Sequence, residues 1–308
     1  AETLAEFRRT GDTPFAVCLM GGASVEGPAA TLAETDTPTY FDPTRAVRGL
    51  DALYRYRSIR TREDRSPTRF DVDADAARSV LKRVERGSDN RLGIEAMGLL
   101  DAYGIPTVES EIVDSPGEAL EAAARIGGDV VMKIVSPDIL HKTDIGGVEV
   151  GVAASEVEDT YESLVTRAKN YQPDARIYGV QIQEHVDLDE GVETIVGTNR
   201  DPQFGPVVLF GLGGVFVEVL EDTTVRIAPV SEPEAAEMIE EIDSAPLLRG
   251  ARGREPVRED AIVETIQRLS QLVIDFPAIV ELDVNPLVAT PDGVAAIDLR
   301  LTVDPEQL

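Results

Sequence analysis

The chain contains two histidines, and one of them lies in a segment whose composition suits group-transfer chemistry. His141 is followed by Lys142, Asp144 and the pair Gly146 and Gly147 in the sequence LHKTDIGGV. An imidazole near neutral pH can move a proton, bind a metal ion or accept a phosphoryl group. Two adjacent glycines let backbone N–H groups approach an anion closely. His141 is therefore a candidate catalytic residue, and the alternative is a surface histidine beside a hairpin.

Lys133 is the second candidate, because it lies inside the apolar run VVMKIV, which predicts a buried strand. A lysine in a buried strand must reach solvent or find an anion. The chain has only four lysines among its 29 basic residues. Retaining a lysine here indicates a compact positive charge, such as one that contacts a nucleotide phosphate. The alternative is a strand-end lysine that points to solvent.

Polar residues with metal-binding oxygens alternate along VELDVNPL, namely Glu281, Asp283 and Asn285. A period of two places them on one face of a strand. Asp298, in VAAIDLR, falls on the strand expected beside it. Carboxylate and carbonyl oxygens from two adjacent strands suit Mg²⁺, which keeps water and phosphate oxygens as its other ligands. The alternative is a solvated polar face in an acidic protein.

A glycine-rich segment, GPVVLFGLGGVFVEVL (205–220), places Gly211, Gly213 and Gly214 after an apolar strand. It resembles a loop that cradles phosphates, but no GKS or GKT follows, so it is not a Walker loop. Phe216 occupies the last position of what would be GxGxxG, so the dinucleotide-binding motif is also incomplete. This segment alone is weak evidence for a phosphate site.

The elements that position these residues begin with an α/β unit over 13–57, in the order strand, helix, strand, helix. Its second helix, over 42–57, opens with Asp42 as the N-cap and Pro43 at the first helical position. This order is half of a doubly wound domain, and we expect its other strands to precede this sequence. The charged stretch 57–73 has no apolar period and predicts an interdomain linker.

The rest of the chain mixes helices with consecutive strands, which favours α+β subdomains around a cleft. Ser115, with Glu118 three residues later, is a capping box that predicts a helix start. We place one domain at 1–62, a linker at 63–85 and a second domain at 86–308. Helices are expected near 74–86, 91–103, 115–127, 155–170, 231–242 and 258–275. Strands are expected near 107–113, 129–135, 148–153, 177–183, 192–197, 206–210, 215–219, 224–228, 278–284 and 294–298.

Length and composition set the class of protein. With 308 residues and 33.2 kDa, the chain can hold two or three domains with a buried core. No run approaches the ~20 apolar residues that span a bilayer, and the first residues lack a signal-peptide layout. The single cysteine, Cys18, excludes an internal disulfide framework and a cysteine-rich zinc site. We therefore expect a cytoplasmic protein that does not associate with membranes.

Acidic residues dominate the charge. Asp and Glu total 57 against 29 Lys and Arg, which gives a net charge of −28 and a pI near 4.3. Such a surface repels nucleic-acid phosphates, so we expect no nucleic-acid partner. High salt screens the self-repulsion, and an acidic, lysine-poor composition is typical of proteins that work in high salt. The alternative is an ordinary acidic cytosolic enzyme.

Together these segments resemble the ATP-grasp (beta-subunit-like) portion of the ADP-forming acetyl-CoA or acyl-CoA synthetases, relatives of succinyl-CoA synthetase. The likeness covers 85–308, and its most specific motifs are HKTDIGGV and FGPVVLFGLGG. MGG and FDPTRAVRGLDAL resemble the tail of the CoA-ligase subunit, so the fold implied is an ATP-grasp fold preceded by a fragment of a flavodoxin-like doubly wound domain. With the acidic composition, a haloarchaeal type is expected. The other segments that carry the likeness are YGIP (103–106), VVMKI (130–134), LLRGARG (247–253) and ELDVNPL (281–287).

The resemblance implies roles around a bound nucleotide. Lys133 would contact the phosphates, and Glu184 and Val186, in IQEHV, would form the adenine-binding hinge. Glu193 would hold the ribose, while His185 replaces an apolar hinge residue. The other implied contacts are Gly146 and Gly147 with the nucleotide, and Asn285 and Asp298 with Mg²⁺.

His141 matches the second phosphohistidine of the acetyl-CoA branch, which relays a phosphoryl group from the other subunit's histidine to ADP. The first phosphohistidine and the CoA site have no match, and residues 1–62 contain no histidine at all. We therefore expect the chain to need the CoA-ligase (alpha-like) portion as its partner, in the same polypeptide or a separate one.

The expected activity is that of an ADP-forming acetate or acyl-CoA ligase: acyl-CoA, ADP and phosphate give carboxylic acid, ATP and CoA. Mg²⁺ and ATP or ADP are the expected cofactors, and we expect a homo-oligomer. One alternative is an acyl-CoA-synthetase-like regulatory module of a protein acetyltransferase, and another is a non-catalytic nucleotide-binding module. Nucleotide-dependent labelling of His141 would separate both from the enzyme.

Overall fold

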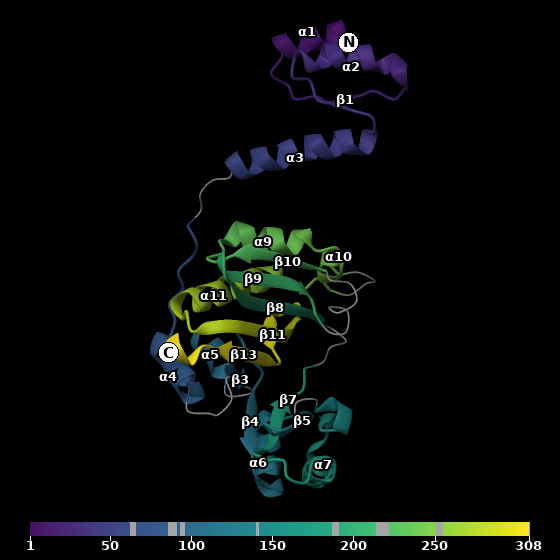
Figure 1. Ribbon diagram of the computed structural model, residues 1–308. Coiled ribbons are helices and arrows are strands. Elements are labelled where there is room, and N and C mark those ends of the chain that lie inside the picture. Colours follow the sequence, from purple (N-terminus) through teal and green to yellow (C-terminus); the bar gives the residue numbers. More distant parts are fainter. Residues whose placement is uncertain are drawn as a thin grey trace. The chain divides into compact units, whose positions relative to one another are not determined.

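The computed structural model describes residues 1–61, 66–85, 91–92, 96–139, 142–186, 191–213, 222–250 and 255–307. The chain divides into two compact units, Ala1–Arg65 and Ser66–Leu308 (Figure 1). Within the described parts of the chain, every helix is too short or too polar to cross a bilayer.

The smaller unit is built on a two-stranded parallel sheet, in which Val17 pairs with Thr39. The carboxylate of Asp42 accepts the backbone N–H of Thr44 at 2.6 Å and so caps the last helix, as predicted. That helix continues through Thr61, so its last turn occupies part of the stretch predicted as linker. The elements are α1 (Glu2–Thr10), β1 (Val17–Cys18), α2 (Glu26–Ala33), β2 (Thr39–Tyr40) and α3 (Pro43–Thr61).

Few apolar side chains are buried among the described residues of the smaller unit. Its buried apolar residues are Ala5, Leu32 and Ala46. By contrast, Met20 and Phe41 are each 73% exposed. The helix α3 carries further exposed apolar side chains, namely Val47, Leu53, Tyr54, Tyr56 and Ile59.

The described residues of the larger unit form two antiparallel sheets, and seven strands belong to the bigger one. Their order is β10-β9-β8-β11-β13-β3, with β12 paired to β11. The strands are β3 (Arg91–Leu92), β8 (Val192–Asp201), β9 (Gly205–Leu212), β10 (Thr223–Ile227), β11 (Ile279–Ala289), β12 (Val294–Ala296) and β13 (Leu299–Val303).

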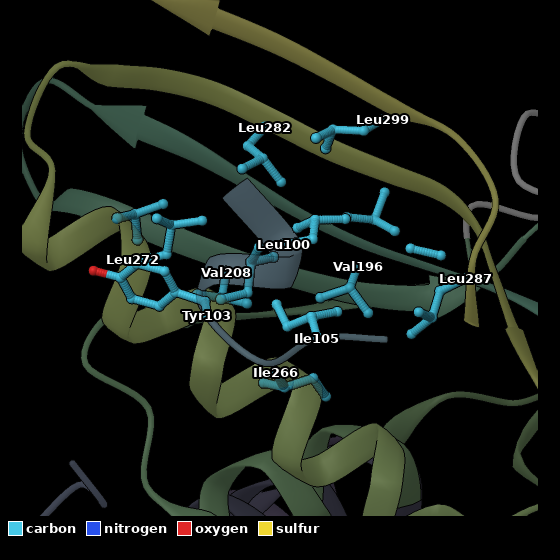
Figure 2. Packing of buried hydrophobic residues seen from close by; sticks show 14 of the residues in the cluster. Leu100, Tyr103, Ile105, Val196, Val208, Ile266, Leu272, Leu282, Leu287 and Leu299 are labelled. Carbon is cyan, nitrogen blue, oxygen red and sulfur yellow. The ribbon is translucent and has the colours of Figure 1, made fainter. Parts of the chain in front are cut away.

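Helices of the larger unit pack on this sheet and form its main core. Leu100, Tyr103 and Ile105 lie against Val208 and Leu282 of the sheet, all almost without exposure (Figure 2). The spacing of apolar residues by three and four along each helix produces this packing, because it gathers them on one helical face. The helices are α4 (Ala74–Glu85), α5 (Met97–Ala102), α9 (Glu232–Glu241), α10 (Ala245–Leu248) and α11 (Glu259–Asp275).

The smaller sheet of this unit has the strand order β4-β7-β5-β6 and a separate core. Met132 and Ile182 are fully buried there beside Leu164 of the covering helix. Ser115 caps the other helix by accepting the N–H of Glu118 at 3.4 Å, as predicted, but the Glu118 carboxylate accepts the N–H of Asp114 at 3.3 Å instead of completing a capping box with Ser115. The elements are β4 (Ser110–Val113), α6 (Pro116–Ile126), β5 (Val130–Val135), β6 (Val148–Val152), α7 (Val157–Tyr171) and β7 (Gly179–Glu184).

The structure departs from the predicted elements around the start of the larger unit. Arg91–Leu92 is a short strand paired to β13, whereas the sequence predicted a helix over 91–103. The larger unit includes α4, which buries Ala77 and Leu81 in its core. The helix α4 itself was predicted, near 74–86. The strand predicted at 215–219 lies outside the described residues.

Candidate functional site

Lys133 lies on the face of the smaller sheet that is turned away from α6 and α7. Side chains alternate along a strand, so Met132 and Ile134 fill the core while Lys133 points to the opposite face. The register places Lys133 opposite Gln181, and Val131 opposite Gln183. Because directly paired residues share a face, Lys133, Gln181 and Gln183 form one polar row on the sheet.

Charged groups from three segments meet at this polar row. Burial lowers the pKa of both Lys133 and Lys142 from the ordinary lysine value. The negative charge of Asp298 opposes that lowering of the pKa for each lysine, and the charge of Lys142 adds to the lowering for Lys133. Both ammonium groups are therefore within electrostatic reach of one carboxylate, in a chain of net charge −28. This arrangement suits a polyanion.

Gln183 joins the smaller sheet to the larger one, and the sequence analysis did not single it out. Its side chain is 1% exposed, and its Nε2 donates to the carbonyl oxygen of Ile297 at 2.8 Å. Its Oε1 is buried without a hydrogen-bond partner among the described residues. Leaving a buried acceptor without a hydrogen bond costs free energy, so Gln183 is a further candidate for ligand binding. The alternating polar residues of VQIQE were the available signal.

Asn285 and Asp298 are brought together, as the metal hypothesis requires. The backbone N–H of Asn285 donates to the carbonyl oxygen of Asp298 at 3.2 Å. The Asp298 side chain accepts the N–H of Leu299 at 2.9 Å, so its second oxygen stays available. Among the described residues, no three His, Cys, Asp or Glu side chains gather as a metal site. An amide and a carboxylate nevertheless fit Mg²⁺, which needs few protein ligands when phosphates supply others.

The predicted polar face of β11 is present. Glu281 and Asp283 alternate with the fully buried Leu282 and Val284. Burial raises the pKa of Asp283, Arg300 on the paired strand opposes this, and the charges of Glu281 and Asp298 raise it further. Asp283 therefore belongs to the electrostatic surroundings of Asp298.

The predicted adenine and ribose contacts lie at strand ends. Glu184 ends β7, and its side chain accepts the N–H of Glu109 at 3.3 Å. His185 is exposed and Val186 is half-buried. Glu193 lies on β8, in the larger sheet, where its carbonyl oxygen accepts the N–H of Gly213 at 2.7 Å. That these side chains surround one nucleotide stays a prediction.

The glycines of the HKTDIGGV segment have their amides engaged within the loop. Gly146 donates its N–H to Thr143 at 3.0 Å and has the left-handed φ of 63°. Gly147 donates to Lys142 at 2.7 Å, and a Cβ there would lie 2.8 Å from Ile134. The close packing against Ile134 is enough to require a glycine at position 147, whether or not a ligand binds there. Nucleotide binding by Gly146 and Gly147 stays a prediction. His141 lies outside the described residues.

The structure thus brings together Lys133, Lys142, Asn285 and Asp298. Gln183 is near them as well, because it is hydrogen-bonded to Ile297, the residue before Asp298. These groups come from the smaller sheet, the loop that follows β5, the strand β11 of the larger sheet, and the two residues between β12 and β13. A site between two sheets can hold the charged part of a ligand against one sheet and its other parts against the second. This geometry can bind and orient a phosphate-bearing molecule.

Comparison with known proteins gives a consistent family. The family model described as ATP-grasp domain matches residues 82–303. The chain is 39% identical over 290 residues to ADP-forming acetate–CoA ligase I of Archaeoglobus fulgidus, covering 94% of this chain and 42% of that protein. It is 42% identical over 226 residues to the beta subunit of the corresponding ligase I of Pyrococcus furiosus, covering 73% of this chain and 97% of that subunit.

A solved structure shares the fold. Acetyl-coenzyme A synthetase 1 of Candidatus Korarchaeum cryptofilum, determined with coenzyme A, Ca-AMPCP and HgCl⁺, superposes with a TM-score of 0.71 at 40% identity. The match covers 74% of this chain and 100% of that one. The chain thus spans less than half of the single-chain ligase from Archaeoglobus fulgidus and nearly all of the Pyrococcus furiosus beta subunit.

Proposed function

Because this chain belongs to the ATP-grasp domain family, we propose that it is the nucleotide-binding part of an ADP-forming acyl-CoA ligase. The observation that carries the proposal is that the charges of Lys133 and Lys142 both interact with that of Asp298, whose backbone is hydrogen-bonded to Asn285. These lysines would bind the phosphates, and Asn285 and Asp298 would hold Mg²⁺. When bound, the metal would neutralise charge and orient the phosphate oxygens.

Other residues complete the proposed nucleotide site. Glu184 and Val186 would bind the adenine, and Glu193 the ribose. The unpartnered Oε1 of Gln183 can accept a hydrogen bond from an amino group, which an adenine base carries. The nucleotide complex of the Korarchaeum enzyme supports an adenine nucleotide with a divalent cation as the ligand.

We also propose that His141 relays a phosphoryl group between the partner portion and ADP. The support is its place in the sequence, directly before Lys142, which approaches Asp298. A neutral imidazole nitrogen is nucleophilic near pH 7 and can pass the group onward. The relatives described above are ADP-forming acetate–CoA ligases, which favours the ligase over the regulatory and non-catalytic alternatives.

The smaller unit supports an alpha-like partner. Matches to the beta subunit and to the Korarchaeum chain cover 73% and 74% of this chain, and the match to a longer single-chain ligase covers 94%. The family model begins at residue 82, so the additional residues of the longer match include the smaller unit. We propose that this unit is the tail of a CoA-ligase portion that supplies the CoA and acyl sites. Cytoplasmic location and homo-oligomerisation complete the proposal.

Calorimetric titration with ADP tests the proposed metal site through Asp298→Asn. The variant should bind ADP about tenfold more weakly than the unsubstituted chain in Mg²⁺, because it loses a charged ligand. In EDTA the variant should bind ADP at least as tightly as the unsubstituted chain does, because the carboxylate that would repel the ADP phosphates is gone. Asp292→Asn, in the exposed turn after β11, is the matched control and should change neither affinity. Equal dependence on Mg²⁺ in both variants would remove Asp298 from the metal site.

Salt dependence tests the proposal of a haloarchaeal type. Raising KCl from low to molar concentration shortens the Debye length to about 3 Å and should raise the melting temperature by about 10 °C or more. The reason is screening of repulsion in a chain of net charge −28. Sucrose of equal osmolality is the control, since it excludes itself from the surface without screening charge. A melting temperature that ignores KCl, or that sucrose raises equally, contradicts the proposal.

A further inference from the structure

The loop between β5 and β6, residues 136–147, is fastened at its start by Arg176. The carboxylate of Asp138 accepts three hydrogen bonds from Arg176. The backbone N–H of Arg176 donates at 2.7 Å, and its guanidinium Nε and Nη2 donate at 3.0 Å and 2.7 Å. These bonds from Arg176 hold the pKa of Asp138 at about 2, well below its usual range. Both carboxylate oxygens are engaged in a forked pair, which is the most directional form of an ion pair.

The same loop is fastened at its end by Arg167. One guanidinium nitrogen, Nη1, donates to the carbonyl oxygen of Gly146 at 2.8 Å and to Glu149 Oε1 at 2.6 Å. Gly146 adopts the left-handed conformation that turns its carbonyl group. The next residue, Gly147, accepts the N–H of Ile134 at 2.9 Å, which joins the loop end to β5.

Arg167 lies on a helix that packs against the smaller sheet, and Arg176 lies in the segment that follows that helix. Arg167 is on α7, whose residues Tyr161, Leu164 and Ala168 are buried in the core. Arg176 follows that helix, two residues before Tyr178, whose N–H donates to Val135 at 2.8 Å. The loop is therefore tied at two points, to α7 and to the segment between α7 and β7.

We propose that Arg167 and Arg176 are positioning residues that clamp the loop 136–147 near its two ends and so hold Lys142, whose carbonyl oxygen accepts the N–H of Gly147, against the smaller sheet. Neither arginine is assigned to the ligand itself. This inference rests on the proposed function, because His141 precedes Lys142 in the chain and the clamps would also set its distance from the nucleotide. Small errors in such a distance reduce phosphoryl transfer strongly.

The position of the loop can be measured without activity. Trypsin cleaves after Lys142 only when the loop opens, and mass spectrometry of the full chain follows that bond. Arg167→Met and Asp138→Asn should each speed cleavage at Lys142 about tenfold, because each removes charge-assisted hydrogen bonds. Arg167→Lys should restore part of the protection. Arg125→Met removes an arginine that pairs with Glu111 in the same subdomain, and should leave cleavage at Lys142 unchanged.

Activity is then measured on the same variants. Labelling by Mg·ATP should be slowed about tenfold to a hundredfold in Arg167→Met and Asp138→Asn, while the Kd for ATP and the melting temperature stay close to those of the control. Unchanged cleavage, or faster cleavage with an unchanged labelling rate, overturns the positioning role. A parallel fall in ATP affinity and melting temperature also overturns it, since that result indicates general destabilisation. Absent labelling of the unsubstituted chain contradicts the relay instead, and cleavage still tests the clamps.

Discussion

Replacement of His141 with alanine is expected to abolish phosphorylation of the chain by Mg·ATP. With the alpha-like portion present, His141→Ala should also abolish ATP formation from acyl-CoA, ADP and phosphate. The variant removes the only group proposed to carry the phosphoryl group between the two portions, and no other proposed residue offers a nucleophilic nitrogen at neutral pH. The measurement is an acid-labile, base-stable phosphoryl adduct, localised by mass spectrometry.

The chain offers a matched control in its second histidine. His185 is exposed beside the proposed hinge, and His185→Ala should keep the adduct at position 141. Nucleotide affinity should be nearly unchanged in His141→Ala, since the proposed phosphate and hinge contacts remain. Labelling of His185, or normal ATP synthesis by His141→Ala in the complete enzyme, would contradict the relay. The loop would then have a structural role only.

Lys133→Ala is expected to produce the largest loss of nucleotide affinity. The buried ammonium should make a charge-assisted hydrogen bond to a phosphate, worth ~1.5–3 kcal/mol. Its removal should therefore weaken ATP binding by about ten- to more than a hundredfold in a calorimetric titration. Burial already lowers the pKa of Lys133, so the fold gains little from this charge and the variant should remain folded.

Lys169→Ala is the control for Lys133. Lys169 lies in the last turn of α7 and is exposed, so its removal changes the net charge equally without touching the proposed site. ATP affinity should stay within about twofold of the unsubstituted chain, since an isolated surface charge contributes little. Equal losses in both variants would mean that total charge, rather than a contact with Lys133, governs binding. An unchanged affinity in Lys133→Ala would remove that lysine from the site.

Periodicity in the sequence predicted the parts of the site that lie on regular strands. VVMKIV placed Lys133 in a buried strand, and the alternation in VELDVNPL placed Glu281 and Asp283 on one face, as observed. Asn285 and Asp298 were expected on adjacent strands, and their backbones are hydrogen-bonded. Such predictions succeed because a strand has only two faces, so residue spacing alone assigns a side chain to one of them.

Contacts between distant segments could not be predicted in this way. Gln183 is tied to Ile297, and the segment before α4 is tied to α11 through Phe70, whose N–H donates to Gln271 at 2.9 Å. The alternation in VQIQE assigns Gln183 to a strand face but does not show what that face packs against, and nothing in the local sequence distinguishes Gln271 from an exposed glutamine. The short strand β3 was missed for a related reason, since its two residues form a strand only by pairing with β13. Tertiary pairing overrides local preference there.

Each sheet of the larger unit has its own hydrophobic core, and this division has a thermodynamic consequence. The two cores share no residue, and the Gln183–Ile297 hydrogen bond is one of the direct ties between the sheets. Sub-global opening can therefore separate the sheets at a lower free energy than complete unfolding. A nucleotide held by groups from both sheets would add its binding free energy to the closed form alone. The ligand would then act as a shared part of the fold, and the cooperativity of unfolding would rise with its concentration.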